Sequence, residues 1–482
     1  MRIIGTPSTQ ARKLNAIASG ALPNGDPVVV NADGTVSTIS GGSATQSAGS
    51  VTLIESATTS HFSATYDANA QKVVIVYQEN VGTAIVGTVS GTSISFGSPV
   101  SIASANSAFL SVTYDANAQK VVVSYRDNSN SGYGTAAVGT VSGTSISFGS
   151  PTVFEAASTN DISTAYDSNA QKVVIAYRDE GNSGYGTVVV GTVSGTSISF
   201  GSPVLIDGSL YLSKPSAIYD ANSQKIVISY KDNGNSEYGT AIVGTVSGTS
   251  ISFGTAVVFE SAAIGTPFSS AYDDSTQKVV IGYRNNGNSG YGTAIVGTVS
   301  GTSISFGTSA VFESASTDRI SLSYDPNAQK TAIIYGDVAN SRYGTVITGS
   351  VSGTSISFDS PLVFENGELD YPSSAYDANA QKVVIAYQDN SNSSYGKAVV
   401  FQVGFDTLNL TSENYIGLAS NGYPDTATAT IDVQGAINDR QSGLTAGQAY
   451  YVQTDGTLGT TPADPSVFAG TAISANKIIV KG

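Results

Sequence analysis

The most conspicuous candidate for chemistry is an aspartate that directly follows a tyrosine and recurs seven times along the chain. Asn or Ser stands two positions after each aspartate and Gln four positions after it, and the aspartates are Asp67, Asp115, Asp167, Asp220, Asp273, Asp325 and Asp377. Oxygen ligands at alternate positions could begin a calcium loop. Neither a terminal Glu nor a Gly at the sharp bend follows, and turn-capping aspartates explain the same pattern. We therefore expect no metal site and no cofactor.

A lysine follows each of these glutamines, so the chain carries seven equivalent positive charges. They are Lys72, Lys120, Lys172, Lys225, Lys278, Lys330 and Lys382. Such a ring could bind an anion. Solvated lysines at the starts of strands, where they also discourage edge-to-edge pairing, account for the same pattern.

Acidic residues after an arginine raise the possibility of glycoside cleavage by two carboxyl groups. The pattern is present at Arg126-Asp127-Asn128 and Arg178-Asp179-Glu180, but other copies read Lys231-Asp232, Arg284-Asn285 and Gln388-Asp389. No copy departs from the others with converging carboxylates, so we expect no enzymatic activity and no catalytic residue. His61, the only histidine, is expected to be a surface residue.

Composition excludes several classes of function. The chain has 482 residues with no Cys, and 21 Lys and Arg against 36 Asp and Glu give a net charge of −15. This balance argues against nucleic-acid binding, and the lack of Cys excludes disulfides and zinc–thiolate sites. No stretch reaches the roughly 18 apolar residues of a membrane helix, and residues 1–7 lack an apolar signal region. We expect a soluble protein that is not inserted in a membrane and not secreted by the general route.

The elements that must position these residues are repeats. The Tyr-Asp pairs lie 48, 52, 53, 53, 52 and 52 residues apart, and Val-Ser-Gly-Thr-Ser-Ile-Ser-Phe occurs six times. A period near 50 residues indicates a repeat architecture. In the third copy, strands are expected at 162–167, 172–178, 187–193 and 197–206, separated by turn residues.

The second strand of each repeat is apolar on both faces, as in Val173 to Ala176. A continuous apolar run of this kind is typical of a strand in a sheet that is covered on both faces. Seven four-stranded sheets packed face to face around an axis form a seven-bladed β-propeller, and a linear β-solenoid is the alternative. Seven Tyr-Asp strands but six Ser-Ile-Ser-Phe strands leave one blade without its outer strand. Residues 45–56 match the missing segment, so we expect them to close the last blade.

The two ends of the chain resemble one another outside the repeats. Leu22 to Val36 matches Leu444 to Leu458, and in both an Asp-Gly pair between apolar runs indicates a hairpin. We expect an all-β chain in which residues 44–404 form the propeller. Residues 1–43 and 405–482 would together build a small β-domain for attachment.

The terminal segments also resemble a known class of proteins. Gly443 to Val452, Asp455 to Leu458, Gly470 to Ala475 and Lys477 to Lys481 look like the ends of virion structural proteins of marine tailed bacteriophages, especially those of cyanobacteria. Leu22 to Val28 is similar to segments of tail-fibre and capsid-surface proteins of these viruses. The resemblance covers about 120 residues and implies location in the virion, synthesis in the host bacterial cytoplasm, contacts with other virion proteins through the terminal domain, and a homo-oligomer on the particle.

Binding residues are expected in the segments that lead from each outer strand to the next inner strand, because these segments vary while the rest of the repeat barely changes. In a propeller they emerge together beside the central channel. Several combine an aromatic with a polar group, which suits stacking on sugar rings. The candidates are His61, Phe62, Phe109, Tyr211, Lys214, Phe268, Arg319, Asp370 and Tyr371. Neutral drift in exposed loops is the open alternative.

The sequence thus favours a non-enzymatic virion protein that displays a propeller for adhesion to a host-surface glycan. A lectin-like propeller outside a virion is the first alternative, and a polysaccharide-degrading enzyme is the second.

Overall fold

The structure is a computed structural model that describes residues 12–31, 33–39, 41–103, 106–207, 211–453, 456–463 and 465–481. The N-terminal residues 1–7 discussed above, Asp455 of the second hairpin and residues 208–210 of the fourth variable segment lie outside these ranges. The chain divides into two compact units, which we call the repeat domain (residues 45–403) and the terminal domain (residues 1–44 and 404–482). The limits differ from the expected ones by one residue.

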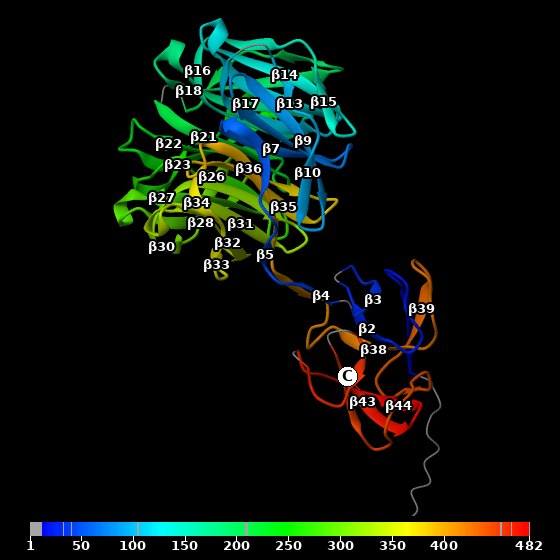
Figure 1. Cartoon of the computed structure of the whole chain (residues 1–482). Helices are drawn as coiled ribbons and strands as arrows, with labels where there is room; N and C mark the ends of the chain where they lie inside the picture. The colour runs from blue at the N-terminus through cyan, green and yellow to red at the C-terminus, as the bar shows by residue number, and fades with distance from the viewer. Residues whose placement is uncertain are drawn as a thin grey trace, which may run out of the picture. The chain divides into compact units, whose positions relative to one another are not determined.

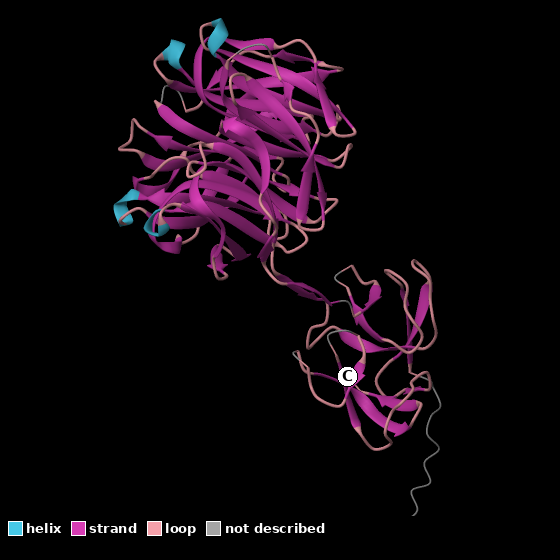
Figure 2. Cartoon of the chain, viewed as in Figure 1, coloured by secondary structure: helices cyan, strands magenta, loops and turns pink. Residues whose placement is uncertain are grey.

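The fold is all-β, as the sequence predicts (Figures 1 and 2). In the described part of the chain the helical segments are four 3-10 turns: η1 (Asn128–Asn130), η2 (Glu180–Asn182), η3 (Asn286–Asn288) and η4 (Val338–Asn340). Within these described ranges, no helix has the length and apolarity that crossing a membrane requires.

Each repeat begins with an inner strand and a second strand joined by the Asp-Gln turn. The inner strands are β7 (Ser60–Asp67), β12 (Ser107–Asp115), β16 (Thr152–Asp167), β21 (Leu212–Asp220), β26 (Ser269–Asp273), β30 (Ala310–Asp325) and β34 (Leu362–Asp377). The second strands are β8 (Lys72–Gln78), β13 (Lys120–Asp127), β17 (Lys172–Asp179), β22 (Lys225–Asp232), β27 (Lys278–Asn285), β31 (Lys330–Asp337) and β35 (Lys382–Asp389).

A third strand follows, and in six repeats a hairpin strand pairs with it. The third strands are β9 (Gly82–Ser90), β14 (Tyr133–Ser142), β18 (Tyr185–Ser194), β23 (Tyr238–Ser247), β28 (Tyr291–Ser300), β32 (Tyr343–Ser352) and β36 (Tyr395–Gln402). The hairpin strands are β10 (Ser93–Phe96), β15 (Ser145–Phe148), β19 (Ser197–Phe200), β24 (Ser250–Phe253), β29 (Ser303–Phe306) and β33 (Ser355–Phe358).

The fourth strand differs from the expected single segment. In the third repeat it is divided into β19 and β20 (Val204–Leu205), which pair with successive parts of β18. The interruption falls at Gly201, where a Cβ would lie 1.9 Å from the carbonyl oxygen of Thr249 in the next repeat. The close approach of that neighbouring hairpin, together with Pro203, which has no N–H to donate, interrupts the strand.

The variable segments are also not loops in every repeat. In β16, β30 and β34 the outer strand of one repeat continues without a break into the inner strand of the next. Shorter outer strands are β11 (Val100–Ser101) and β25 (Val257–Ala263), which pair with β9 and β23. The expectation of exposed loops is therefore wrong for these three repeats, since the backbone is already paired there.

The second strands are buried on both faces, as their composition predicts. Val173, Val174, Ile175 and Ala176 are each 0% exposed. Successive strand residues point to opposite faces, so both faces of this sheet must be covered by neighbouring repeats.

A serine three residues before each Tyr-Asp tyrosine ties the repeats together. Its hydroxyl accepts a hydrogen bond from an inner-strand N–H of the following repeat, at 2.9–3.2 Å. The bonds are Val112 N to Ser63, Thr164 N to Ser111, Ala217 N to Ser163, Ser270 N to Ser216 and Leu322 N to Ser269. The hydroxyls of Ser321 and Ser374 lie 3.1 Å apart, and Ala64 N of the first repeat donates to Ser373 of the seventh at 3.0 Å.

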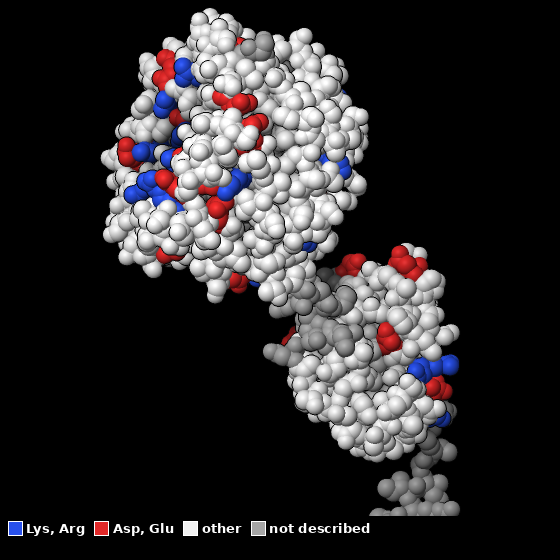
Figure 3. All heavy atoms as spheres, in the orientation of Figure 1, with Lys and Arg blue, Asp and Glu red and all other residues white. Residues whose placement is uncertain are grey.

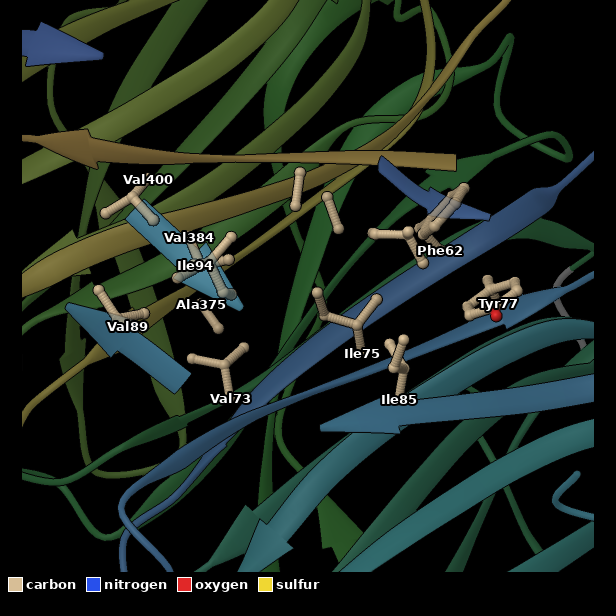
Figure 4. Close-up of a cluster of buried hydrophobic side chains, with 13 residues drawn as sticks. Phe62, Val73, Ile75, Tyr77, Ile85, Val89, Ile94, Ala375, Val384 and Val400 are labelled. Carbon is tan, nitrogen blue, oxygen red and sulfur yellow. The ribbon is translucent and has the colours of Figure 1, made fainter. Parts of the chain in front are cut away.

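Two further contacts join the first and seventh repeats. The hydroxyl of Tyr66 accepts a hydrogen bond from the N–H of Asn379 at 3.2 Å, as Tyr114 does from Asn69. Figure 4 shows a buried cluster in which Val73 and Ile75 of the first repeat lie with Val384 and Val400 of the seventh.

The expected pairing of residues 45–56 with the last repeat is present. β5 (Ser47–Ala48) and β6 (Thr52–Thr58) both pair with β36. Gly49 N donates to Val400 O at 2.8 Å, as Gly97 N does to Val86 O at 3.0 Å in the first repeat. The N-terminal segment thus takes the place of the hairpin that the seventh repeat lacks.

The terminal domain contains the same module twice. One sheet has the order β1 (Lys13–Ile17), β39 (Thr428–Asp432), β38 (Tyr415–Ala419), β2 (Pro27–Val30), β3 (Val36–Thr38). The other has the order β40 (Ile437–Asn438), β44 (Lys477–Val480), β43 (Val467–Ser474), β41 (Ala449–Val452), β42 (Leu458–Gly459). A further pair consists of β4 (Gly41–Ala44) and β37 (Phe405–Leu408).

Matching hydrogen bonds support the equivalence of the two modules. Gly25 N donates to Ala419 O at 3.0 Å, and Gly447 N donates to Ala472 O at 2.8 Å. The sequence similarity of the two hairpins therefore extends to whole sheets, and in chain order the repeat domain interrupts the first module between β3 and β38.

Candidate binding pocket

A bulge in the inner strand brings the variable residues of the repeat domain together around one pocket. The pairing of β7 with β8 shifts between Ser60 and Ser63, and the same shift occurs in β12, β16, β21, β30 and β34. Bulges redirect side chains and are frequent beside functional sites.

In these six repeats the bulged residue stands five positions before the Tyr-Asp tyrosine, and this position holds a different residue in each of the seven repeats. The seven residues, all within the described ranges, are His61, Phe109, Asp161, Lys214, Pro267, Arg319 and Tyr371. We call them the rim residues. Except for Pro267, which follows a cis peptide bond, each has a φ between 44° and 55°. Left-handed backbone is uncommon for residues other than Gly, although His and Asp adopt it more readily than the other four, and it is frequent at functional sites.

Two other positive-φ positions provide an internal comparison. The Gln at the end of each Asp-Gln turn, such as Gln71 or Gln171, is the same residue in all seven repeats. Ser131, Ser183 and their equivalents are also constant among the repeats that carry them. A left-handed backbone alone therefore does not explain why the rim position varies.

All seven rim residues line one pocket of about 440 Å³. The pocket also has apolar lining residues. The residue after the rim position is Phe62, Leu110, Ile162, Pro215, Phe268, Ile320 or Pro372, and all of these except Ile320 contribute to the lining. The volume is within the range of small-molecule sites, about 300–1,000 Å³.

One side of the rim is aromatic. The ring of His61 lies 5.1 Å from that of Phe109 in an edge-on arrangement and 4.8 Å from that of Tyr371. Tyr371 comes from the seventh repeat, His61 from the first and Phe109 from the second, and these three repeats are neighbours. We call this set the aromatic wall.

The other rim residues are mainly charged. Lys214 Nζ is 2.8 Å from Asp161 Oδ1 and 5.1 Å from the centre of the Phe109 ring. Arg319 Nε is 2.9 Å from Asp370 Oδ1, and its guanidinium carbon is 5.7 Å from the centre of the Tyr371 ring. Each cation is thus held between a carboxylate and an aromatic ring, a combination that fixes its position.

The environment keeps His61 neutral. Burial, together with the nearby Lys214 ammonium, lowers the pKa of its imidazole to about 4. The nitrogen Nδ1 is 3.1 Å from the hydroxyl of Ser60. The expectation that His61 is an ordinary surface residue is wrong, because the bulge turns its ring into the aromatic wall.

Charged groups gather at this end of the repeat domain. Its five arginines are Arg126, Arg178, Arg284, Arg319 and Arg342, and Figure 3 shows charges of both signs clustered on one side of the domain. Arg178 Nη1 lies 3.3 Å from Asp161 Oδ2, and Arg342 Nε lies 3.1 Å from Asp318 Oδ2.

The structure brings together most of the binding residues that the sequence indicates. His61, Phe62, Phe109, Lys214, Phe268, Arg319 and Tyr371 line the pocket. Tyr211 does not: its side chain is 44% exposed, and a Cβ at Gly184 would lie 2.5 Å from its ring. Asp370 is buried outside the lining and holds Arg319.

Sequence reasoning missed Asp161 and Pro267 among the rim residues. Asp161 is 7% exposed and bridges Lys214 and Arg178. Counting five residues back from every Tyr-Asp pair would have found both.

The other candidates for chemistry have structural roles. Asp167 Oδ1 accepts the N–H of Ala170 at 2.8 Å, so it caps its turn. Asp127 and Asp179 accept N–H groups of the 3-10 turns η1 and η2. Lys330 pairs with Asp359 at 2.8 Å. Within the described ranges, no group of three or more His, Asp or Glu side chains is arranged to hold a metal.

Asp318 is the carboxyl near the pocket with an unusual environment. Burial raises its pKa although Arg342, Arg319 and Arg284 act in the opposite direction. Its Oδ1 has no hydrogen-bond partner among the described residues. The side chain is not part of the pocket lining.

Comparison with known proteins gives little beyond this geometry. No family model matches the chain, and no curated protein matches it in sequence. Similar solved structures include a protein of unknown function from Dyadobacter fermentans DSM 18053 (10% identity, TM-score 0.43, covering 73% of this chain and 99% of that one). Another is the C-terminal WD40 domain of Sif2, with 12% identity and a TM-score of 0.43, covering 73% of this chain and 99% of that domain. A third is a chain of a mitotic checkpoint complex, with 8% identity and a TM-score of 0.47, covering 75% of this chain and 96% of that one.

At these identities and TM-scores below 0.5, we draw no conclusion about this chain from its structural neighbours. The likeness of the terminal segments to phage virion proteins therefore stays a prediction.

Proposed function

We propose that the seven repeats are the blades of a closed seven-bladed β-propeller and that the propeller binds a carbohydrate in the pocket on its axis. The serine bonds that run through successive repeats and return from Ser373 to Ala64 support ring closure. A linear solenoid would leave the apolar faces of its first and last repeats uncovered, whereas Val73 and Val384 share one buried cluster.

The observation that carries the binding function is the set of rim residues. Seven equivalent positions hold seven different side chains, while the neighbouring turn and hairpin residues of the same repeats are nearly constant. All seven line one pocket. A ligand without sevenfold symmetry needs this kind of asymmetric lining, and neutral drift gives no reason for variation to concentrate on the lining.

Carbohydrate is the ligand class that fits the lining best. Aromatic rings stack on the apolar faces of sugars, and fixed polar groups beside them select hydroxyl patterns. The aromatic wall supplies the rings, while Asp161, Lys214 and Arg319 supply the polar groups. The rim carboxylate is already bonded to two cations, Lys214 and Arg178. This arrangement favours binding over acid catalysis, so we propose a non-enzymatic protein.

The terminal domain is proposed as the attachment module of a phage virion protein, with the propeller displayed for adhesion to host glycans. Two observations support this proposal. The terminal segments resemble phage virion proteins, and the repeat domain is inserted into one of the two duplicated modules of the terminal domain. The proposal includes other virion proteins as partners, several copies on the particle, and no role in nucleic-acid binding or membrane insertion. Weak binding at each pocket would be strengthened by these copies.

Two alternatives are kept open. A lectin-like propeller outside a virion would use the same pocket. A polysaccharide-degrading enzyme would need a protonated carboxyl near the ligand, and Asp318 is the residue to test, by measuring release of reducing sugar by the wild-type protein and Asp318→Asn.

The experiment is a glycan array probed with the full-length wild-type chain and with the double variant Phe109→Ala, Tyr371→Ala. We expect binding by the wild type and at least tenfold weaker binding by the double variant. Tyr211→Ala is the matched control, because it removes an exposed aromatic near the pocket without changing the lining. Equal binding by all three proteins would refute the pocket as the site.

A further inference from the structure

The charge of the pocket rim is opposite to that of the chain. The rim contains one acid, Asp161, and two cations, Lys214 and Arg319, so it sums to +1 in a chain of −15. The repeat domain has five arginines, and none of them lies at an Asp-Gln turn. Arg319 is a rim residue within β30, and the other four lie near the ends of second strands or just before β32. A neutral saccharide would not require this distribution.

The two rim cations keep N–H groups that can donate further hydrogen bonds to an anion in the pocket. Arg319 uses Nε for Asp370, and its two Nη groups have no hydrogen-bond partner among the described residues. Lys214 Nζ is 2.8 Å from Asp161 and has three hydrogens to donate. Both side chains are about one third exposed, at 34% and 37%, so their free donors are accessible.

Arginine suits a particular kind of anion. The planar guanidinium forms two parallel hydrogen bonds with a carboxylate, and such charge-assisted pairs are stronger than neutral ones. Asp370 is buried and holds Nε, so the remaining edge of the guanidinium keeps a constant direction. The Tyr371 ring under the guanidinium restricts it further.

The aromatic wall lies next to these cations. Arg319 contacts Tyr371, and Lys214 contacts Phe109, the two outer members of the wall. A sugar ring stacked on the wall would place a substituent at its edge close to one of the cations. His61, in the middle, adds no charge at neutral pH.

We propose that the pocket selects a saccharide with a carboxylate group, such as a uronic or sialic acid residue, and that Arg319 binds this carboxylate. Asp370 acts as a positioning residue that orients the guanidinium. This inference rests on the proposed carbohydrate-binding function and specifies its ligand class.

The test is calorimetric titration of the full-length protein with three probes: a galacturonic acid hexamer, a mannuronic acid hexamer and sialyllactose. Each is compared with its carboxyl-reduced form, which keeps the ring and the other hydroxyls. We expect at least one acidic probe to bind at least tenfold more tightly than its reduced form. We expect Arg319→Gln to remove this difference by weakening the acidic probe much more than its reduced form.

Arg342→Gln is the matched control, since Arg342 pairs with Asp318 and Glu368 and does not line the pocket. Asp370→Asn should weaken binding of the acidic probe more than binding of the reduced form. Equal affinity for acidic and reduced probes, abolished by Phe109→Ala, would overturn the carboxylate inference and leave the carbohydrate function standing. Absence of binding by the wild type to every probe and every arrayed glycan would overturn the proposed function itself.

Discussion

The neutral, half-buried imidazole of His61 leads to a prediction that can be measured at a single site. The chain contains one histidine, so selective ¹³C labelling gives one imidazole resonance. Its pKa should be about 4 in the folded protein, against 6.5 in an unconstrained chain. Burial is the main cause, and the ammonium of Lys214 is the second.

The effect on stability has a definite sign. The folded-state pKa is below the unfolded-state value, so the unfolded chain takes up a proton first as the pH falls through 6.5. This group therefore lowers the free energy of unfolding by about 2 kcal/mol between pH 7 and pH 5, and by about 3 kcal/mol once the pH is below 4. Above pH 7 it contributes almost nothing.

The assay combines NMR titration with urea unfolding at pH 7 and pH 5. His61→Phe keeps a ring between Phe109 and Tyr371 but cannot be protonated, so its stability relative to the wild type should rise by about 2 kcal/mol at the lower pH. Lys214→Ala should raise the pKa of His61. A His61 pKa between 6 and 7 would refute the reasoning, because the imidazole would then be solvated and the aromatic wall would not be packed as described.

Three further predictions concern the framework. Gly149→Ala should destabilise the protein by about 1–3 kcal/mol in urea unfolding, because a Cβ there would lie 2.0 Å from a carbonyl oxygen of the next repeat. Gly422→Ala, with its nearest atoms at 3.9 Å, should have little effect, and similar losses for both variants would contradict this packing. Ser216→Ala should cost about 1–3 kcal/mol by leaving a buried N–H without its acceptor, and an unchanged unfolding midpoint would argue against the inter-repeat bonds. Replacing residues 40–408 with Gly-Ser-Gly should leave a folded terminal domain with dispersed NMR signals, and a collapsed spectrum would show that the inserted domain is needed for folding.

Much of the architecture could be predicted from local pattern. The Tyr-Asp spacing gives the repeat, and the apolar run from Val173 to Ala176 shows that each sheet is covered on both faces. The missing hairpin of the seventh repeat predicts the pairing of residues 45–56 with β36. These features depend on composition along a strand, so the sequence shows them directly.

The pocket could be predicted only in part, because it depends on pairing between distant residues. The bulge at His61 arises from the register of β7 against β8, and no residue type marks it. Asp161 becomes important only because Lys214, in the next repeat, reaches it. The duplication in the terminal domain could be seen in the hairpins, but the equivalence of β38 with β43 needed the pairing pattern.

We propose the pocket lined by the rim residues as the binding site of the repeat domain. The most direct measurement is the His61 imidazole resonance during titration with whichever saccharide the array identifies. We expect a progressive shift that saturates with the same dissociation constant as calorimetry, because a sugar on the aromatic wall must contact this ring. Calorimetric binding with an unchanged His61 resonance would contradict this assignment and show that the ligand binds elsewhere on the protein.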